Sequence, residues 1–355
     1  MNSAQMIKDL TSAFGPPGFE EDVNLVAQKY VPAGYRTERD KMNNFYMFPE
    51  KANTSAPVVL LDAHSDELGL MVHYIKPNGT IAFTGLGNWT ASVMPSSKVA
   101  IRNRDGRLIA GIVASKPPHF SNPAERDAPL AISNMVIDIG ASAKEEVEER
   151  FKIGIGAPIV PHVEFDHNAE EDIMIAKAFD CRLGCAAVLD TLVAIKGEKL
   201  PLNVVGAFST QEENGIRGAK VVGRKVAPDL AIVFEGSPAD DTFVEPSAVQ
   251  TAMRKGPMLR HMDAGMVTHP RFIRFALDVA RKYNIPVQES VRLGGSTNGA
   301  AYHLLGEGVP TIVIGYPVRY IHSNHSIATM ADYQAGVDLA KAILKELNAE
   351  VIEKF

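Results

Sequence analysis

Short apolar runs recur along this chain, and helix-like segments or polar side chains follow them directly. Residues 57–63, 202–208 and 230–234 are runs of this kind. Their length and their content of Val, Leu and Ile predict buried strands. Strands that alternate with helices form a largely parallel sheet covered on both faces. We therefore expect an α/β fold with three layers, α/β/α.

The pattern changes between about residues 72 and 164. Residues 72–84, 97–103 and 107–114 are short β-like runs, and turn sequences such as Asn78-Gly79 separate them. This stretch predicts a small β-rich, barrel-like domain. We expect it to be inserted into an α/β domain made of residues 1–71 and 165–355, and a chain of 355 residues has room for both.

Carboxylates and imidazoles follow several of the predicted strands. The carboxyl ends of parallel strands meet at one edge of a sheet, and ligands bind there. We therefore expect one site, although Asp180 could also be only a helix N-cap and His325 is a rival to His322. The residues that follow apolar runs in this way are His64, Asp180, Glu212, Glu213, Glu235 and His322.

The residue types in this set point to divalent metal ions. Imidazoles and carboxylates without a set of thiolates match zinc, cobalt or manganese better than a structural zinc or an iron–sulfur centre. We expect Asp180 to bridge two ions, with His64 and Glu235 on one ion and Glu213 and His322 on the other. A shared water would ionise near a pKa of about 7 and supply hydroxide at neutral pH.

The two remaining acidic residues have different expected roles. Neighbouring side chains on extended chain point apart, so Glu213 is expected to face a metal while Glu212 faces the water and acts as general base. Asp66 lies two residues after His64 and is expected to hold its ring. Cys181 and Cys185 lie one helical turn apart and could share a face as soft ligands, but buried, inert thiols explain them more simply.

Charge and cysteine content exclude some classes of protein. The net charge is −6 and no run of Lys or Arg stands out, which argues against a nucleic-acid partner. Two cysteines cannot build a disulfide framework, which favours a reducing compartment. Residues 1–10 lack an apolar core of signal-peptide length, and no run approaches about 18 apolar residues. We expect a cytoplasmic protein that binds neither membranes nor nucleic acid.

Several short motifs occur in a fixed order along the chain. They are Ala-His-Ser-Asp-Glu-Leu-Gly at 63–69, Lys-Ala-Phe-Asp-Cys-Arg-Leu-Gly at 177–184, Gln-Glu-Glu at 211–213, Glu-Gly at 235–236 and Arg-Tyr-Ile-His-Ser at 319–323. With these motifs the chain resembles the M42 family of metallo-aminopeptidases, the group of tetrahedral, glutamyl and deblocking aminopeptidases.

The resemblance implies a zinc-peptidase type of fold and the removal of amino-terminal residues from short peptides. It implies two divalent metal ions held by the ligands named above, zinc first, with Glu212 as base and Asp66 as catalytic support. It also implies that residues 72–164 are a dimerisation domain, and that dimers build a homo-oligomer of up to twelve subunits.

Four residues depart from the family pattern. Cys181 stands where Asp or Asn is usual and Asn214 where a small apolar residue is usual, while Thr297 and Ser326 replace acidic residues. These changes concern substrate preference and assembly more than hydrolysis. Two alternatives stay open: a related metal-dependent amidase or deacylase, and a cage-forming scaffold without catalysis.

Overall fold

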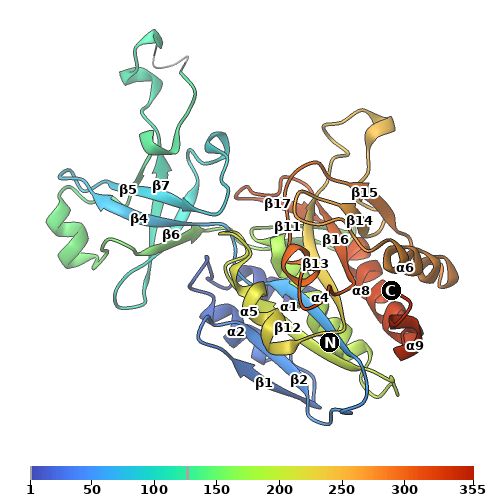
Figure 1. Cartoon of the computed structure of the whole chain (residues 1–355). Helices are drawn as coiled ribbons and strands as arrows, with labels where there is room; N and C mark the ends of the chain where they lie inside the picture. Colours follow the sequence, from blue (N-terminus) through green and yellow to red (C-terminus); the bar gives the residue numbers. More distant parts are fainter. Residues whose placement is uncertain (1, 125–127) are drawn as a thin grey trace.

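A mixed β-sheet forms the centre of the larger part of the molecule (Figure 1). The computed structural model describes residues 2–124 and 128–355, and in these residues the sheet has eight strands in the order β1-β2-β12-β3-β13-β16-β14-β15. Four adjacent strands in its middle are parallel: β12 (Asn203–Ser209), β3 (Val58–His64), β13 (Leu230–Pro238) and β16 (Thr311–Val318). The predicted α/β class is confirmed.

The edges of the sheet are not uniformly parallel. On one side β1 (Tyr35–Arg39) and β2 (Phe45–Pro49) pair in antiparallel fashion, and β2 is also antiparallel to β12. On the other side β14 (Met258–Met262) is antiparallel to β16 and parallel to β15 (Gln288–Val291). The parallel strands that matter for a site at the carboxyl edge are therefore the four in the middle.

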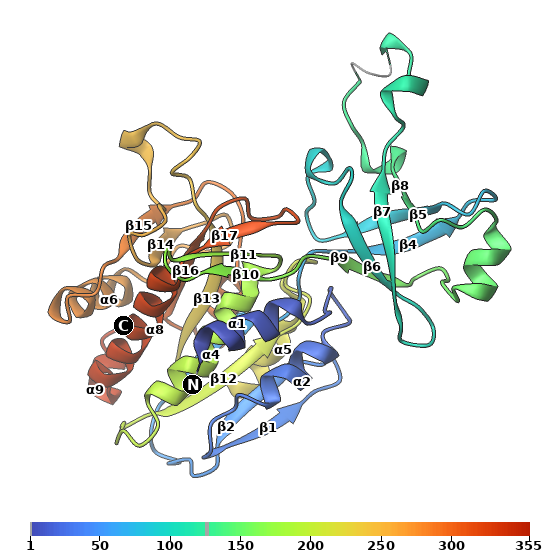
Figure 2. The ribbon, with the colours of Figure 1, turned by 180° about the vertical axis from the view of Figure 1, so that it is seen from behind.

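Helices cover both faces of the sheet, which makes three layers (Figure 2). On one face α4 (Phe179–Ala194) packs against the middle strands, with α1 (Ser3–Ser12) and α8 (Met330–Glu346) beside it. On the other face lie α5 (Arg217–Val226) and α7 (Gly299–Tyr302). The larger part, as far as the structure describes it, also contains the α-helices α2 (Glu21–Gln28), α6 (Pro270–Lys282) and α9 (Ala349–Ile352).

Alternation along β3 divides the interior into two cores. Val59 and Leu61 are buried in the core on the α4 side, whereas Leu60 is buried in the core on the α5 side. Successive side chains of a strand point to opposite faces. The same alternation gives His64, at the end of β3, the orientation of Leu60 rather than that of Leu61.

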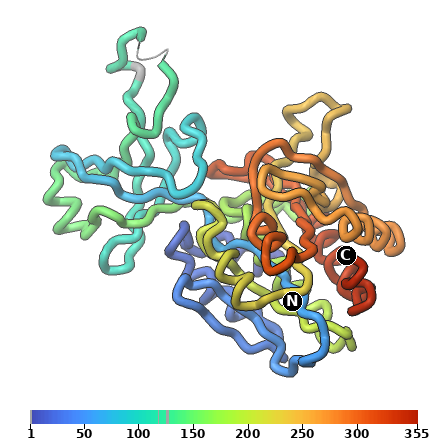
Figure 3. The backbone as a smooth tube through the Cα atoms, viewed as in Figure 1, coloured from blue at the N-terminus to red at the C-terminus, as the bar shows by residue number. Residues whose placement is uncertain are grey.

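The predicted β-rich insert is a closed barrel that stands beside the α/β body (Figure 3). Its interior is a separate apolar cluster that includes Val72, Ile101 and Ile159. The first strand begins at Gly69, before the predicted limit at 72, and residues 125–127 lie outside the described residues. The described strands are β4 (Gly69–Ile75), β5 (Ile81–Leu86), β6 (Lys98–Arg102), β7 (Leu108–Ala114), β8 (Val136–Asp138) and β9 (Pro158–Pro161).

Strand β11 (Ile173–Ala176), just before Asp180, does not join the main sheet. It pairs with β10 (Asp166–Asn168) and β17 (Ser326–Ala328) in a separate antiparallel sheet. Residues 331–352 do not form one helix, because Asn348 accepts a hydrogen bond from the Val351 N–H and starts α9 as its N-cap. None of the described helices is long and apolar enough to cross a membrane.

Candidate metal centre

The carboxyl ends of the four middle strands bring most of the predicted residues together. His64 is the last residue of β3, Glu235 lies on β13, and Glu212 and Glu213 follow β12. His322 follows β16 after a short connection. Because these strands are neighbours and parallel, their ends meet at one edge of the sheet, as the sequence predicts.

Asp180 reaches the same place by a different route. It follows β11 of the small sheet and lies at the start of α4, where its backbone is not helical, with φ −87° and ψ 109°. Its Oδ1 lies 3.1 Å from His64 Nε2 and its Oδ2 lies 3.3 Å from His322 Nε2. Gly236 permits this position, because a Cβ there would lie 2.8 Å from the Asp180 Cα. Asp180 thus stands between the two imidazoles.

Two groups of potential ligand atoms share Asp180. In the first, Glu235 Oε1 lies 3.2 Å from His64 Nε2, and in the second, Glu213 Oε1 lies 3.7 Å from His322 Nε2. Within each group the atoms lie within 4.8 Å of one another, and Cys181 is a further member of the first group. The structure therefore brings together all five residues expected to be ligands.

The chemistry of this donor set fits divalent cations. Glu213 Oε1 and Glu235 Oε2 are buried and have no hydrogen-bond partner among the described residues. Buried carboxylate oxygens without a partner are costly unless they coordinate a cation. A cavity of about 20 Å³, bounded in part by Asp180, Glu213 and His322, gives room for about one particle of the size of water.

Electrostatic coupling between the same groups is strong. Burial raises the pKa of Glu213 to about 8 and the pKa of Glu235 to about 7. Burial alone would lower the pKa of His322, but Asp180 and Glu213 raise it to about 9. Without a cation the cluster therefore retains protons at neutral pH. A divalent ion replaces such protons when it binds.

The two adjacent glutamates lie in a turn, not in extended chain. Strand β12 ends at Ser209, Gln211 has a φ of +55°, and the Gly215 N–H donates to the carbonyl oxygen of Glu212 at 2.9 Å. The alternation rule of a strand therefore does not explain how Glu212 and Glu213 are oriented. Hydrogen bonds from outside the turn provide the orientation.

Asp66 is the main source of these hydrogen bonds. Its Oδ1 accepts from the Glu212 N–H at 2.9 Å and its Oδ2 accepts from the Glu213 N–H at 3.0 Å. Its carboxylate lies 3.5 Å from His64 Nδ1, whereas its backbone oxygen lies closer to that nitrogen, at 3.0 Å. Asp66 therefore supports the ring chiefly through its main chain, and its carboxylate holds the glutamate turn.

Glu20 supports the same turn, and sequence reasoning missed it. Its Oε1 accepts from the Gly18 N–H at 2.8 Å and from the Gln211 N–H at 3.1 Å. The side chain is fully buried beside the amino end of α2. A glutamate at the start of an amphipathic helix is normally solvated, so nothing in the local pattern distinguished it.

A buried ionic cluster of Glu67, Lys177 and Arg182 lies behind the site, and the sequence alone did not indicate its role. Lys177 Nζ contacts both carboxylate oxygens of Glu67, and Arg182 Nη2 lies 3.4 Å from Glu67 Oε1. Arg182 also donates to the carbonyl oxygens of Leu10 at 2.6 Å and Gly15 at 3.2 Å. The cluster ties the amino-terminal segment to the segment that carries His64 and Asp66.

The remaining sequence candidates lie as follows. Cys181 and Cys185 are free and buried, and their thiols donate to the carbonyl oxygens of Phe234 at 3.2 Å and His64 at 3.1 Å. His325 is exposed and belongs to neither ligand group found in the described residues. His322 is therefore the better candidate of the two histidines.

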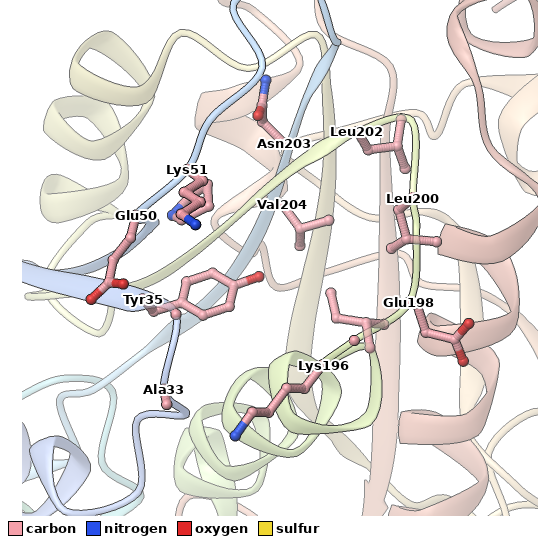
Figure 4. Close-up of a pocket in the computed structure, with 14 residues that line it drawn as sticks. Ala33, Tyr35, Glu50, Lys51, Lys196, Glu198, Leu200, Leu202, Asn203 and Val204 are labelled. Atoms are coloured by element: carbon pink, nitrogen blue, oxygen red, sulfur yellow. The ribbon is translucent and has the colours of Figure 1, made fainter.

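A groove of about 590 Å³ lies at the opposite end of the sheet (Figure 4). Tyr35, Lys51, Lys196 and Val204 are among the residues that line it. Its lining contains no histidine, cysteine or aspartate. The groove therefore offers no rival to the ligand groups at the carboxyl edge.

The fold and these two ligand groups define an α/β protein with a candidate two-metal centre. The family model described as M42 glutamyl aminopeptidase matches residues 44–339. The chain belongs to this family of metal-dependent peptidases. It is therefore a hydrolase of peptide bonds, as the sequence predicts.

Relatives of known name cover almost the whole chain. A glutamyl aminopeptidase of Lactococcus lactis subsp. cremoris is 32% identical over 348 residues, 98% of this chain and 97% of that protein. A lysyl aminopeptidase of Pyrococcus furiosus is 31% identical over 353 residues, 97% of each. The crystal structure of a TET aminopeptidase from a marine sediment Thaumarchaeota archaeon has a TM-score of 0.95 at 34% identity and covers 99% of this chain and 98% of that one.

The buried carboxyl group of Glu20 makes stability depend on pH. Burial, with the nearby charge of Asp66, raises its pKa from 4.5 to about 8. Between these values the folded state holds a proton that the unfolded chain has released, so stability falls as pH rises, by up to about 1.4 kcal/mol per pH unit. Glu20→Gln cannot titrate and should lose this dependence.

Urea unfolding of the chelator-treated protein between about pH 5 and 8 measures this difference. The free energy of unfolding of the unmodified protein should fall relative to that of Glu20→Gln as pH rises. The exposed neighbour Glu21 provides the control, since Glu21→Gln should follow the unmodified protein. Parallel curves for all three proteins would show that Glu20 is ionised in the folded state throughout.

Proposed function

We propose that the protein is an aminopeptidase with two divalent metal ions per subunit, which removes the amino-terminal residue from short peptides. The observation that carries this proposal is the pair of ligand groups that share Asp180. Glu212 directly precedes the ligand candidate Glu213 in the turn that Asp66 holds. Family membership supports the reaction, and the geometry supports the assignment of residues to roles.

The ligand roles follow the two groups. His64, Asp180 and Glu235 would hold one ion, and Asp180, Glu213 and His322 would hold the other. Such ions lower the pKa of a water towards about 7 and polarise the carbonyl group of the substrate. Zinc is the first choice for this oxygen and nitrogen donor set, with cobalt or manganese as alternatives.

Glu212 is the proposed general base. Without bound cations, burial raises its pKa well above the usual range, Glu235 and Glu213 act in the same direction, and His64 opposes them. Two cations beside it would lower this pKa, and the ionised carboxylate can then take a proton from the attacking water and return it to the leaving amine. Asp66 keeps Glu212 in place by accepting its backbone N–H.

The proposed substrates are short peptides with a free amino terminus, and the proposal names no preferred terminal residue. The relatives named above are a glutamyl and a lysyl aminopeptidase, so members with this fold differ in the residue they remove. An amidase or deacylase with the same metals is the second candidate, because the same chemistry cleaves a small acylated amine.

We also propose that residues 72–164 are a dimerisation domain, that residues 1–71 and 165–355 form the catalytic domain, and that dimers build a larger homo-oligomer of up to twelve subunits. Two aliphatic side chains of the barrel strand β7, Leu108 and Ile112, are exposed, and Ile112 also lines a mainly apolar groove. Apolar surface of this kind marks contact sites between proteins. A cytoplasmic location belongs to the proposal too, since both cysteines are free thiols.

Replacement of the general base tests the mechanism. Glu212→Gln should lower kcat by at least about a hundredfold, because the amide cannot accept the proton, while the bound metal content stays unchanged. Hydrolysis of an amino-acid arylamide and elemental analysis of the purified protein measure the two quantities. Glu50→Gln, at the remote groove, should retain full activity. Unchanged turnover by Glu212→Gln would defeat the assigned role.

Metal removal and blocked substrates test the reaction class. Protein treated with a chelator should lose activity towards a panel of arylamides and regain it with zinc, cobalt or manganese. A peptide with a free amino terminus should be cleaved, and the same peptide with an acylated amino terminus should not. Cleavage of the blocked form alone would favour the deacylase, and activity without any metal would contradict the proposal.

A substitution on the exposed face of β7 tests the proposed assembly. Ile112→Asp places a charge on a side chain that is 45% exposed, and it should reduce the particle mass measured by light scattering. Leu25→Asp is the matched control, because Leu25 of α2 is 54% exposed on the α/β body, and it should leave the mass unchanged. A monomeric unmodified protein would remove this part of the proposal.

A further inference from the structure

His322 of the second ligand group contacts the barrel. His64 of the first group makes no hydrogen bond to the barrel among the described residues. His322 Nδ1 lies 3.2 Å from the backbone oxygen of Asn88, in the connection that follows β5. His64 Nδ1 instead lies 3.0 Å from the backbone oxygen of Asp66, two residues further along its own segment. The two candidate metal-binding imidazoles are therefore supported by different parts of the molecule.

His322 depends on this support more than His64 does. The side chain of His322 is 33% exposed, compared with 1% for His64, so packing alone restrains it less. Its backbone has a φ of +58°. Residues other than glycine adopt this conformation at a cost in free energy, and they keep it only where neighbouring groups hold them. The carbonyl oxygen of Asn88 is such a neighbour.

The contact with Asn88 selects the nitrogen that faces the other ligands. A neutral imidazole that donates from Nδ1 to a carbonyl oxygen keeps its lone pair on Nε2. Nε2 of His322 is the atom near Asp180 Oδ2, at 3.3 Å, and near Glu213 Oε1, at 3.7 Å. Hydrogen bonds of this kind orient metal-binding histidines and raise their affinity for the ion.

The same barrel connection lies against the second ligand, Glu213. Gly87 has a φ of +93°, and a Cβ on it would lie 2.2 Å from Leu68 Cδ2 and 3.2 Å from Glu213 Cβ. Glycine is therefore required for so close an approach. The N–H of Gly87 donates to Asn214 Oδ1 at 2.7 Å, and Asn214 directly follows Glu213.

A second amide side chain holds the barrel close to His322. Asn324, two residues after His322, donates from Nδ2 to the carbonyl oxygen of Val93 at 2.7 Å and to Ser97 Oγ at 2.5 Å. Asn214 and Asn324 thus attach residues 87–97 of the barrel on either side of the second ligand group. The chain positions next to both ligands are tied to the inserted domain.

We propose that residues 87–88 of the barrel are a structural part of the second metal group, and that Asn214 is the positioning residue that places them. This inference rests on the proposed two-metal function. Its consequence is that attachment of the barrel controls affinity for the ion held by Glu213 and His322, while affinity for the ion held by His64 and Glu235 is independent of it.

Titration of the metal-free full-length protein with Zn²⁺ alone tests the inference. Isothermal calorimetry should resolve two ions in the unmodified protein. Asn214→Ala removes the acceptor for the Gly87 N–H, so the first ion should bind as before and the second about 10–100-fold more weakly. Asn214→Asp keeps an acceptor oxygen and should bind the second ion at least as tightly as the unmodified protein.

Two further variants separate this effect from general loosening of the barrel. Arg102→Met removes the ion pair with Asp22 and the guanidinium that lies 3.9 Å over the Phe14 ring, at a part of the junction away from the ligands. It should leave both ions bound as before. Asn324→Ala should weaken the binding of the second ion only. This variant provides the test if Asn214→Ala does not fold.

The outcomes distinguish the inference from the function on which it rests. An unmodified protein that binds fewer than two ions contradicts the two-metal proposal itself. Two ions in the unmodified protein, with the same two affinities in Asn214→Ala and Asn324→Ala, overturn only the inference. The inference is also overturned if Asn214→Ala and Asn324→Ala lower the affinities for both ions equally, or if Arg102→Met also loses the second ion.

Discussion

The site depends on one electrostatic constraint: several carboxylates are buried close together around two imidazoles. Asp180 lies within 3.1 Å and 3.3 Å of the two rings, and burial raises the pKa values of Glu213 and Glu235 to about 8 and about 7. Such an arrangement is unfavourable unless positive charge compensates it, either as protons or as cations. The parallel middle strands impose the crowding, because their carboxyl ends lie side by side.

Rigid support is needed to keep like charges in so small a volume. The carboxylate of Asp66 accepts from the backbones of Glu212 and Glu213, and Glu20 accepts from the backbone just before them. Behind these residues Arg182 donates to carbonyl oxygens of the amino-terminal segment and lies close to Glu67. Hydrogen bonds between buried groups favour one conformation, and here they fix the turn that carries Glu212 and Glu213 next to the two ligand groups.

The barrel contacts the candidate metal centre as well as standing beside the α/β body. Its residues 87 and 88 touch the segment of Glu213 and the ring of His322, whereas the first ligand group is held by segments of the body. The two halves of the centre therefore have different structural support. The proposed contacts between subunits through the barrel would link assembly to the site, since the same small β structure also touches the candidate ligand His322.

The sequence by itself determined the α/β class, the β-rich insert and the residue types of the site, because buried runs of strand length and the polar residues after them are local patterns. Only the tertiary structure decided how Asp180 enters the site, since a strand pattern does not name its partners and β11 belongs to the small antiparallel sheet. The same holds for the turn at Glu212, for buried Glu20 and for the contact between Asn88 and His322. These depend on segments far apart in the chain, whose contacts arise from packing and leave no trace in local periodicity.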